Sequence, residues 1–298
     1  MSPESTAKRQ SLPIAMVMAC RPKQWAKNVL VFVAPAAAGV LTEAYRLRLT
    51  IIGFIAFCLV SSATYLLNDV LDVESDRKHP TKRFRPIASG DLPVPVAVAM
   101  AVVMFCVGLA VALSANRTLV LIVALYAVLT TAYSFLFKRI AILDLVILSS
   151  GFILRLLGGA FAAEVEVSDW FLLISLFGSM FIAAAKRFAE KKELGDRAAE
   201  LRPTLGEYSV EYLGFIRNVS VAALVMSYCL WAVERANVTE ASPWAQLSII
   251  PFLIAVLRYA LLVDQGKGSA PEDVILHDRQ MQFMGILWVV ILAIGMYA

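Results

Sequence analysis

The chain has 298 residues, of which 60% are hydrophobic and 17% charged, and its mean hydropathy is +0.74. Soluble domains are about 45–50% apolar and about 25% charged, so this composition excludes an ordinary soluble protein. The four cysteines are far apart and form no C-x-x-C pair, so neither a disulfide framework nor a zinc site is expected. The net charge of +4 points only weakly to anionic partners, and no nucleic-acid partner is expected.

The hydrophobic residues fall into blocks long enough to cross a bilayer, which takes roughly 20 residues per helix. Backbone groups in hydrocarbon need partners within the protein and no alternating barrel pattern is present, so these blocks are expected to be helices. We predict one all-α polytopic membrane domain over residues 1–298. Its nine spans are residues 28–41, 50–67, 94–113, 118–136, 141–163, 170–185, 212–233, 245–263 and 281–297.

The distribution of Lys and Arg predicts the orientation of these spans. With the N-terminus inside, the inner segments carry 22 of the 27 Lys and Arg residues and the outer loops carry 4. Inner loops are enriched in these residues, so the N-terminus is expected in the cytoplasm and the C-terminus outside. Three long inner loops, residues 68–93, 186–211 and 264–280, are then expected to cap a cytoplasmic active site.

The clearest candidate site begins where the second predicted span ends. If the helix continues past the membrane surface, Asn68, Asp69, Asp72 and Asp76 fall on one face of it. Carboxylates this close repel one another unless a cation lies among them. Hard oxygen ligands suit Mg²⁺, so we predict these four residues as magnesium ligands and the three aspartates as catalytic. A solvated acidic helix end is the competing interpretation.

A basic stretch follows these acids and favours the metal–diphosphate interpretation, with Lys82, Arg83 and Arg85 as candidate substrate-binding residues. The combination resembles the first conserved motif of the UbiA-like prenyltransferase superfamily. The residues that carry this resemblance are Asn68-Asp69-x-x-Asp72-x-x-x-Asp76 and Arg85-Pro86-Ile-x-x-Gly90. The resemblance implies nine transmembrane helices around a central cavity open to the cytoplasm, in which Mg²⁺ holds a diphosphate.

The chain departs from the common superfamily pattern after its sixth span, where typical members carry a second aspartate-rich motif. The corresponding stretch is Lys186-Arg187-Phe-Ala-Glu190-Lys191, and the next aspartate is Asp196. A second metal cluster is therefore not expected, and direct pairing of Lys or Arg with phosphate is expected instead. The candidates for substrate binding here are Lys186, Arg187, Glu190 and Lys191.

Arg155 lies within the fifth predicted span, about 22 Å along a helix from Ile140. A guanidinium at that depth is costly unless it faces a polar cavity or partner. No acidic partner is evident in the neighbouring spans, so we expect a ligand phosphate or the acidic motif to be its partner, and Arg155 to be catalytic.

Further candidates for substrate binding lie at the predicted inner rim, where anchoring at the membrane interface is the alternative role. They are Lys23, Lys27, Asn28, Tyr133 and Lys138. The acidic motif is accompanied by Arg21-Pro-x-Gln-Trp25-x-Lys27-Asn28, His79-Pro-Thr-Lys-Arg-Phe-Arg-Pro86, Lys186-Arg187-Phe-Ala-Glu190 and a closing segment with Pro271-Glu-Asp273 and Asp278-Arg279. On these motifs, residues 21–280 are similar to the decaprenyl-phosphate phosphoribosyltransferase family. That resemblance implies transfer of 5-phosphoribose from 5-phosphoribosyl 1-diphosphate to a polyprenyl phosphate, for lipid-linked arabinose and cell-wall arabinan.

Two other functions stay open: a UbiA-type prenyltransferase with a prenyl diphosphate donor, and a membrane transporter. A phosphoribosyl donor needs a metal site for its diphosphate and a separate cationic site for its 5-phosphate, and the chain offers both motifs. The acceptor phosphate ionises with a second pKa of about 6, so no general base is required. The only histidines, His79 and His277, form no catalytic pair. The oligomeric state is open, with a homo-oligomer possible.

Overall fold

The computed structural model describes residues 11–79, 81–137, 140–195, 203–238, 243–266, 274 and 277–297, and all regular structure in these ranges is helical. The long helices are α3 (Ala44–Leu71), α6 (Val94–Leu113), α7 (Arg117–Phe135), α8 (Leu143–Ala162), α9 (Asp169–Leu194), α12 (Val210–Val238), α14 (Ile249–Asp264) and α16 (Arg279–Tyr297). The short ones are α1 (Leu12–Ala19), η1 (Pro22–Phe32), α2 (Val33–Ala37), η2 (Val40–Thr42), α4 (Val73–Lys78), η3 (Lys82–Phe84), α5 (Pro86–Ser89), α11 (Pro203–Glu207) and α13 (Trp244–Leu247).

Seven helical segments within the described ranges are long and apolar enough to cross a membrane. They are Ala44–Leu71, Val94–Leu113, Arg117–Phe135, Leu143–Ala162, Asp169–Leu194, Val210–Ala236 and Trp244–Asp264. Each overlaps one of the predicted spans, which confirms the prediction of an all-α protein with several membrane helices. The ninth predicted span coincides with α16, whose apolar part, Arg279–Gly295, is shorter.

The first predicted span, residues 28–41, is not one regular α-helix. Its chain is wound as the 3₁₀ helix η1, then as the single turn α2, and it ends at Gly39 with φ of 75°. Pro35 lacks the backbone N–H that a longer α-helix would use, and the left-handed Gly39 stops the helix. This segment packs against α8 so closely that a Cβ added at Gly159 would lie 1.8 Å from the Val31 carbonyl oxygen.

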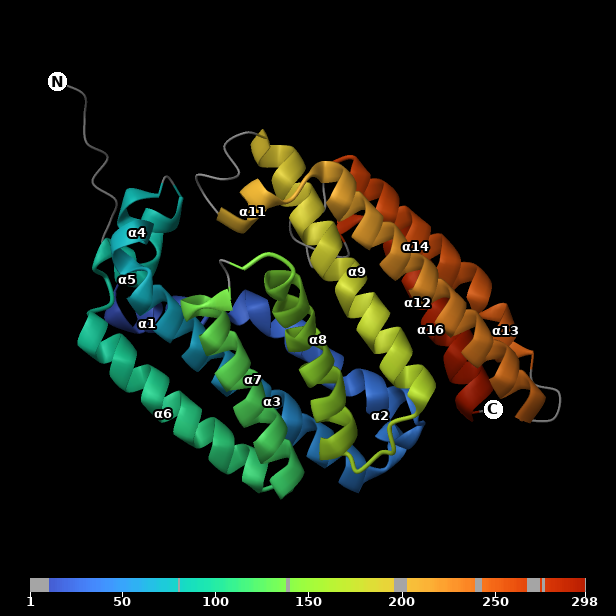
Figure 1. Ribbon diagram of the computed structural model, residues 1–298. Helices are drawn as coiled ribbons and strands as arrows, with labels where there is room; N and C mark the ends of the chain where they lie inside the picture. The colour runs from blue at the N-terminus through green and yellow to red at the C-terminus, as the bar shows by residue number, and fades with distance from the viewer. Residues whose placement is uncertain are drawn as a thin grey trace.

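The helices form two groups that meet at α8 and α9 (Figure 1). In the first group, buried side chains of α3, α7 and α8 form one apolar core, around residues such as Phe57, Leu119 and Leu154. In the second group, α9, α12 and α14 form another, around residues such as Phe181 and Leu262. The helices therefore run side by side, and several of their ends lie together at the upper edge of Figure 1.

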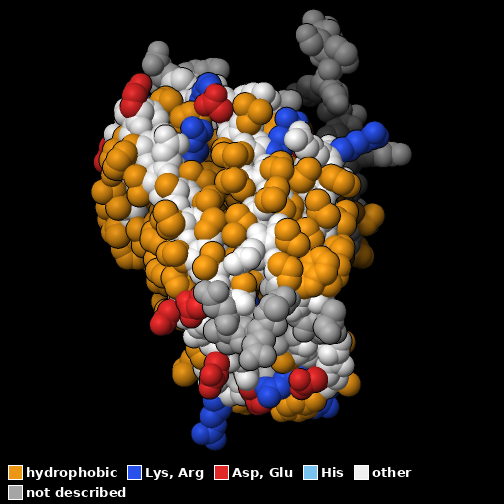
Figure 2. All heavy atoms as spheres, turned by 90° about the vertical axis from the view of Figure 1, so that its right-hand side faces the viewer, with side chains coloured by type: hydrophobic (Ala, Val, Ile, Leu, Met, Phe, Trp, Pro, Cys, Tyr) orange, Lys and Arg blue, Asp and Glu red, His pale blue; other side chains and the backbone are white. Residues whose placement is uncertain are grey.

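The outer face of α12, α14 and α16 carries the surface expected next to lipid. Figure 2 shows a broad area of hydrophobic side chains on this side of the molecule, with Lys, Arg, Asp and Glu gathered above and below it. Large apolar side chains such as Phe215, Met226 and Ile286 are more than half exposed there, at 62%, 61% and 66%. Exposed apolar side chains gathered over one broad face are typical of a membrane-embedded surface, so we infer that this face lies against the bilayer.

The close approach of η1 to α8 gives the first testable prediction. Gly159→Ala should destabilise the protein by about 1–3 kcal/mol, because the new Cβ overlaps the Val31 backbone. Gly285→Ala in α16 is the matched control, since a Cβ there meets nothing within 4 Å. Thermal unfolding of the detergent-purified protein measures both. Equal stability of the two variants would contradict the packing described.

Candidate active site

The acidic segment is helical, but it is not the single continuous helix that the sequence predicts. Helix α3 ends at Leu71, Asp72 has φ −93° and ψ 8°, and α4 begins at Val73. The helical pattern of backbone hydrogen bonds nevertheless continues across Asp72. The N–H of Asp72 donates to the Asn68 carbonyl at 2.9 Å, and that of Asp76 donates to the Asp72 carbonyl at 2.8 Å. Asp69 and Asp76 therefore still face the same way.

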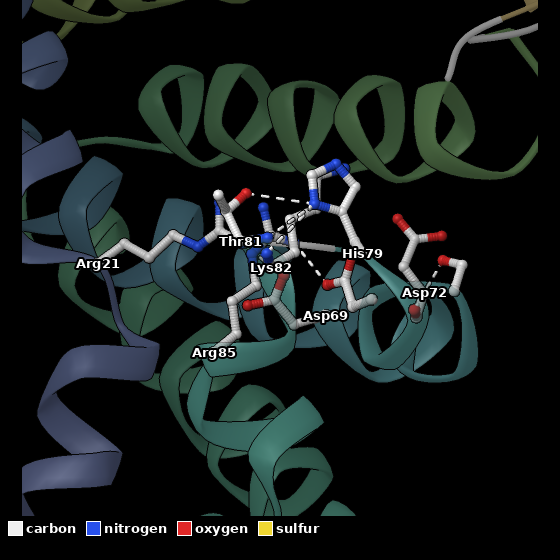
Figure 3. A network of polar contacts seen from close by, with 9 residues as sticks. Arg21, Asp69, Asp72, His79, Thr81, Lys82 and Arg85 are labelled. Carbon is white, nitrogen blue, oxygen red and sulfur yellow. Dashed lines mark hydrogen bonds and ion pairs between the residues drawn. The ribbon is translucent and has the colours of Figure 1, made fainter. Parts of the chain in front are cut away.

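Asp69 and Asp76 are buried and share one guanidinium. Arg85 donates from Nη1 to Asp69 Oδ1 at 3.0 Å and to Asp76 Oδ2 at 2.7 Å. A second guanidinium, that of Arg21, donates from Nη2 to the same Asp69 oxygen at 2.5 Å. Figure 3 shows Arg21 and Arg85 reaching Asp69 from different parts of the chain. We name Arg21, Asp69, Asp76 and Arg85 the acidic cluster. The positive charges of its two arginines balance the negative charges of its two aspartates.

Arg21 was not among the predicted site residues. It is held in the left-handed region, with φ of 53°, at the start of η1, and its guanidinium carbon lies 5.1 Å from the centre of the Tyr65 ring. A non-glycine residue rarely adopts this conformation, so the surrounding contacts must hold it there. No sequence spacing links Arg21 to Asp69, which lies 48 positions away.

The other predicted residues of this motif lie around the acidic cluster rather than in it. Asn68 and Asp72 are half-buried, and Asp72 lies to the right of the cluster in Figure 3. Lys82 and Arg83 are exposed in η3. Desolvation and the charge of Lys82 lower the pKa of His79, whose Nδ1 accepts the backbone N–H groups of Thr81 and Lys82 at 3.3 Å.

The carboxylate oxygens of the acidic cluster are suitable ligands for Mg²⁺. Because one guanidinium nitrogen reaches both Asp69 and Asp76, their carboxylates are close enough to share one cation. Mg²⁺ usually takes one or two carboxylates and completes its shell with water and substrate phosphates. In the part of the chain that the structure describes, no three His, Cys, Asp or Glu residues form a metal site by themselves. The residues therefore fit an ion held jointly with a diphosphate.

The second predicted motif centres on a buried guanidinium. Arg187, with 1% of its side chain exposed, donates from Nε to Asp144 Oδ2 at 2.8 Å. Its Nη1 donates to Glu190 Oε2 at 2.7 Å, and its Nη2 donates to the Tyr133 hydroxyl at 2.8 Å. These bonds join α7, α8 and α9. The expectation that Arg187 pairs directly with phosphate therefore differs from the structure, in which all three of its nitrogens bind protein acceptors.

Asp144 and Tyr208 complete this network, and sequence reasoning missed both. The Tyr208 hydroxyl donates to Asp144 Oδ1 at 2.6 Å and accepts the N–H of Ile142 at 2.5 Å. Burial and the bond to Asp144 raise the pKa of Tyr208, so its hydroxyl keeps its proton. Ile142 is the centre of a strained γ-turn, with φ of 67°. The missed signal was Asp144 itself, an acid at the edge of an apolar span.

Lys186, Glu190 and Lys191 lie on the last turns of α9, which runs on as helix to Leu194 inside the predicted loop 186–211. The Lys186 and Glu190 side chains are 31% and 22% exposed, and Lys186 Nζ lies 4.0 Å from Glu190 Oε1. Lys191 donates to the Leu205 carbonyl in α11 at 2.8 Å. Lys186, Glu190 and Lys191 are all partly exposed, and the Lys191 ammonium binds a backbone carbonyl.

Arg155 and Asn28 are buried and bonded to each other. The Arg155 Nε donates to Asn28 Oδ1 at 2.7 Å, Nη1 to the Gly151 carbonyl at 2.7 Å and Nη2 to the Tyr126 hydroxyl at 2.8 Å. Our expectation for Arg155, a phosphate or the acidic motif, differs from these contacts. The physical reason for this difference is that neutral oxygen atoms already accept hydrogen bonds from the guanidinium N–H groups of Arg155. Asn28 likewise holds η1 against α8 rather than lining the rim.

Three predicted basic residues are left: Lys23, Lys27 and Lys138. Lys23 is exposed and Lys27 is half-buried, both in η1. Lys138 lies outside the described residues, as does most of the predicted loop 264–280. Substrate binding by Lys23, Lys27 and Lys138 stays a prediction.

Comparison with known proteins identifies the family. The sequence profile of the UbiA prenyltransferase family matches residues 29–293. A decaprenyl-phosphate phosphoribosyltransferase of Corynebacterium glutamicum is 43% identical over 99% of this chain and 91% of its own length. One of Mycobacterium tuberculosis is 42% identical over 94% of this chain and 93% of its own length.

The fold agrees with that assignment. The structure of a UbiA homolog from Archaeoglobus fulgidus bound to GPP and Mg²⁺ matches with a TM-score of 0.70 at 16% identity, over 95% of this chain and 100% of that chain. This chain belongs to the UbiA prenyltransferase family. The resemblance drawn from the acidic and basic motifs is thereby confirmed.

The network around Arg187 gives the second testable prediction. Asp144→Leu should cost about 3–5 kcal/mol of stability, because it removes one half of a buried ion pair. The double variant Asp144→Leu/Arg187→Leu should recover part of this loss, since no guanidinium then stays buried beside an apolar side chain. Thermal unfolding in detergent measures the stabilities of the wild type, the two single variants and the double variant, which together form a double-mutant cycle. Additive losses, or an unchanged Asp144→Leu protein, would contradict the pairing.

Proposed function

We propose that this chain transfers the 5-phosphoribosyl group of 5-phosphoribosyl 1-diphosphate to decaprenyl phosphate or a related polyprenyl phosphate, releasing diphosphate. The observation that carries the proposal is near-full-length identity of 42–43% to two decaprenyl-phosphate phosphoribosyltransferases. The chain is accordingly an enzyme, a pentosyltransferase. Its product would supply lipid-linked arabinose for cell-wall arabinan.

The arrangement of charge supports this donor. The acidic cluster lies at the ends of α3, α4 and α5, and Lys186 and Glu190 lie on the last turns of α9. In Figure 1, α4 and α5 are at the upper left and the end of α9 is at the upper edge. The donor carries a diphosphate on C1 and a phosphate on C5 of its ribose. We assign the diphosphate to the acidic cluster and the ribose 5-phosphate to the α9 end, with Lys186 as its principal cation.

The reaction then needs few protein groups. An oxygen of the lipid phosphate bonds to the ribose C1 as the bond from C1 to the diphosphate oxygen breaks, and the diphosphate leaves with the electron pair. The ribose passes through an oxocarbenium-like state, as in glycoside chemistry. The acceptor is already ionised, so no side chain has to remove a proton from it.

The acidic cluster would stabilise the leaving diphosphate. Mg²⁺, when bound by Asp69 and Asp76 with help from Asn68 and Asp72, supplies a Lewis acid and a clamp for the diphosphate oxygens. The guanidinium groups of Arg21 and Arg85, which contact these carboxylates, would counter the growing charge of the diphosphate. The rim residues Lys23, Lys27, Lys82, Arg83 and Lys138 are proposed as further phosphate contacts.

Arg155, Arg187 and Tyr133 take different parts in this proposal. Because their polar atoms already bind protein partners in the structure, we assign them to positioning: Arg155 holds η1 in place, and Arg187 orients Tyr133 and Glu190. Lys191 ties α9 to α11. Their loss should disturb the site without removing a direct ligand of the leaving group.

The proposed topology follows the distribution of basic residues. We propose nine membrane crossings within one domain, with α16 and the irregular η1–α2 segment added to the seven long helices. The N-terminus, a central cavity and the loops 68–93, 186–211 and 264–280 would face the cytoplasm, and the C-terminus would lie outside the cell membrane.

One assay tests the proposed function. Purified protein is incubated with Mg²⁺, polyprenyl phosphate and 5-phosphoribosyl 1-diphosphate labelled in its ribose, and label is followed into the lipid fraction. We expect Mg²⁺-dependent labelling of the lipid and release of diphosphate. Consumption of a prenyl diphosphate without lipid labelling would instead indicate an ordinary prenyltransferase. Passage of label into vesicles without reaction would indicate a transporter.

The acidic cluster gives the third testable prediction. Asp76→Asn should lower Mg²⁺-dependent transfer by at least about 100-fold, because a charged metal ligand is replaced by a neutral one. Glu74→Gln, an exposed acid on the same helix α4, is the matched control and should keep its activity. A folded Asp76→Asn protein with wild-type transfer would show that Asp76 serves only its ion pair with Arg85.

A further inference from the structure

Glu190 is a carboxylate whose position is fixed but which is not fully buried. Its Oε2 accepts from Arg187 at 2.7 Å, and Arg187 is itself anchored to Asp144 and Tyr133. With 22% of the Glu190 side chain exposed, the carboxylate can still be reached from outside the bundle. Such a group is oriented before any ligand arrives, so little conformational entropy is lost when it binds one.

A metal ion does not suit this carboxylate. Arg187 donates directly to it, and the Lys186 ammonium lies 4.0 Å from its other oxygen. Asp144, the next acid in the network, already accepts from Arg187 and from Tyr208 with its two oxygens. Glu190 is a single carboxylate beside two cations, whereas the acidic cluster has two carboxylates for its two arginines. The positive charges around Glu190 would repel a metal ion, so its chemistry is that of a hydrogen-bond acceptor.

The proposed donor brings hydrogen-bond donors to this place. If the diphosphate lies at the acidic cluster and the 5-phosphate near Lys186, the ribose ring lies between them with its 2- and 3-hydroxyl groups. Carboxylates are the acceptors that proteins use for ribose hydroxyls in dinucleotide sites, because a charged acceptor makes a strong bond to a hydroxyl. A prenyl chain has no hydroxyl groups to offer.

We propose that Glu190 accepts hydrogen bonds from the ribose hydroxyls of the donor and so selects a phosphoribosyl donor. This inference rests on the proposed function and adds a specificity residue to it. Arg187 is the positioning residue that holds Glu190 in place. The carboxylate would reject donors lacking the hydroxyl, because its desolvated oxygen would then have no partner from the substrate.

The test compares three donors under the transfer assay: 5-phosphoribosyl 1-diphosphate and its 2-deoxy and 3-deoxy analogues. Wild-type protein should prefer the full ribose over at least one analogue by about 10- to 100-fold in kcat/KM, the effect of one hydrogen bond to a charged group. Glu190→Gln should reduce that preference to a few-fold, mainly by slowing transfer from the full donor. Glu190→Asp, which withdraws the charge by one methylene, should be intermediate.

Glu193→Gln is the matched control, since Glu193 is an exposed acid on the same turns of α9. It should keep the wild-type preference. If Glu190 only supports Arg187, its variants would lose rate equally with all three donors and the preference would stay unchanged, which would overturn the inference. Wild-type protein that transfers phosphoribose without any preference would overturn it too. Absence of transfer from every donor would instead defeat the proposed function itself.

Discussion

The structure depends on one constraint, that a guanidinium placed inside an apolar helix bundle must have its N–H groups bound. Arg187 meets it with two carboxylates and a tyrosine hydroxyl, and Arg155 meets it with neutral oxygen atoms alone. Leaving such a group without partners costs several kcal/mol, more than most single contacts contribute. The helices that supply these partners are therefore held at fixed positions. The charged side chains at the ends of these helices are positioned as a result.

The same constraint separates residues that hold the site from residues that can meet a substrate. Arg187, Asp144 and Arg155 are almost fully buried, and their polar atoms are taken up within the protein. Arg21, Arg85, Lys186 and Glu190 are partly exposed. Charges in the acidic cluster balance as they stand, so an incoming Mg²⁺-diphosphate can exchange partners with its arginines without leaving a buried charge alone.

Local sequence predicted the features that depend on composition and spacing. The apolar blocks predicted all eight long helices, and the spacing of Asp69 and Asp76 predicted that their side chains face the same way. Proline and glycine in residues 28–41 could have warned that this segment is not a regular helix. The break at Asp72 was not predictable, because it leaves the helical hydrogen-bond spacing intact.

Contacts between distant parts of the chain were beyond that reasoning. Arg187 meets Asp144 across 43 positions and Asp144 meets Tyr208 across 64, and no periodicity relates them. Arg155 has no acidic partner among these contacts because it binds neutral oxygen atoms, which no charge pattern in the sequence reveals. Asp144 was overlooked for the same reason that Arg187 was assigned to phosphate: each was considered alone, whereas burial requires the pair.

The central claim is that the donor lies with its diphosphate at the acidic cluster and its ribose toward the end of α9. A structure determined with 5-phosphoribosyl 1-diphosphate and Mg²⁺ bound measures this directly. We expect the diphosphate and Mg²⁺ at the carboxylates of Asp69 and Asp76, with the 5-phosphate near Lys186. A donor bound the opposite way round, with its diphosphate at Lys186 and no metal at Asp69 or Asp76, would contradict it.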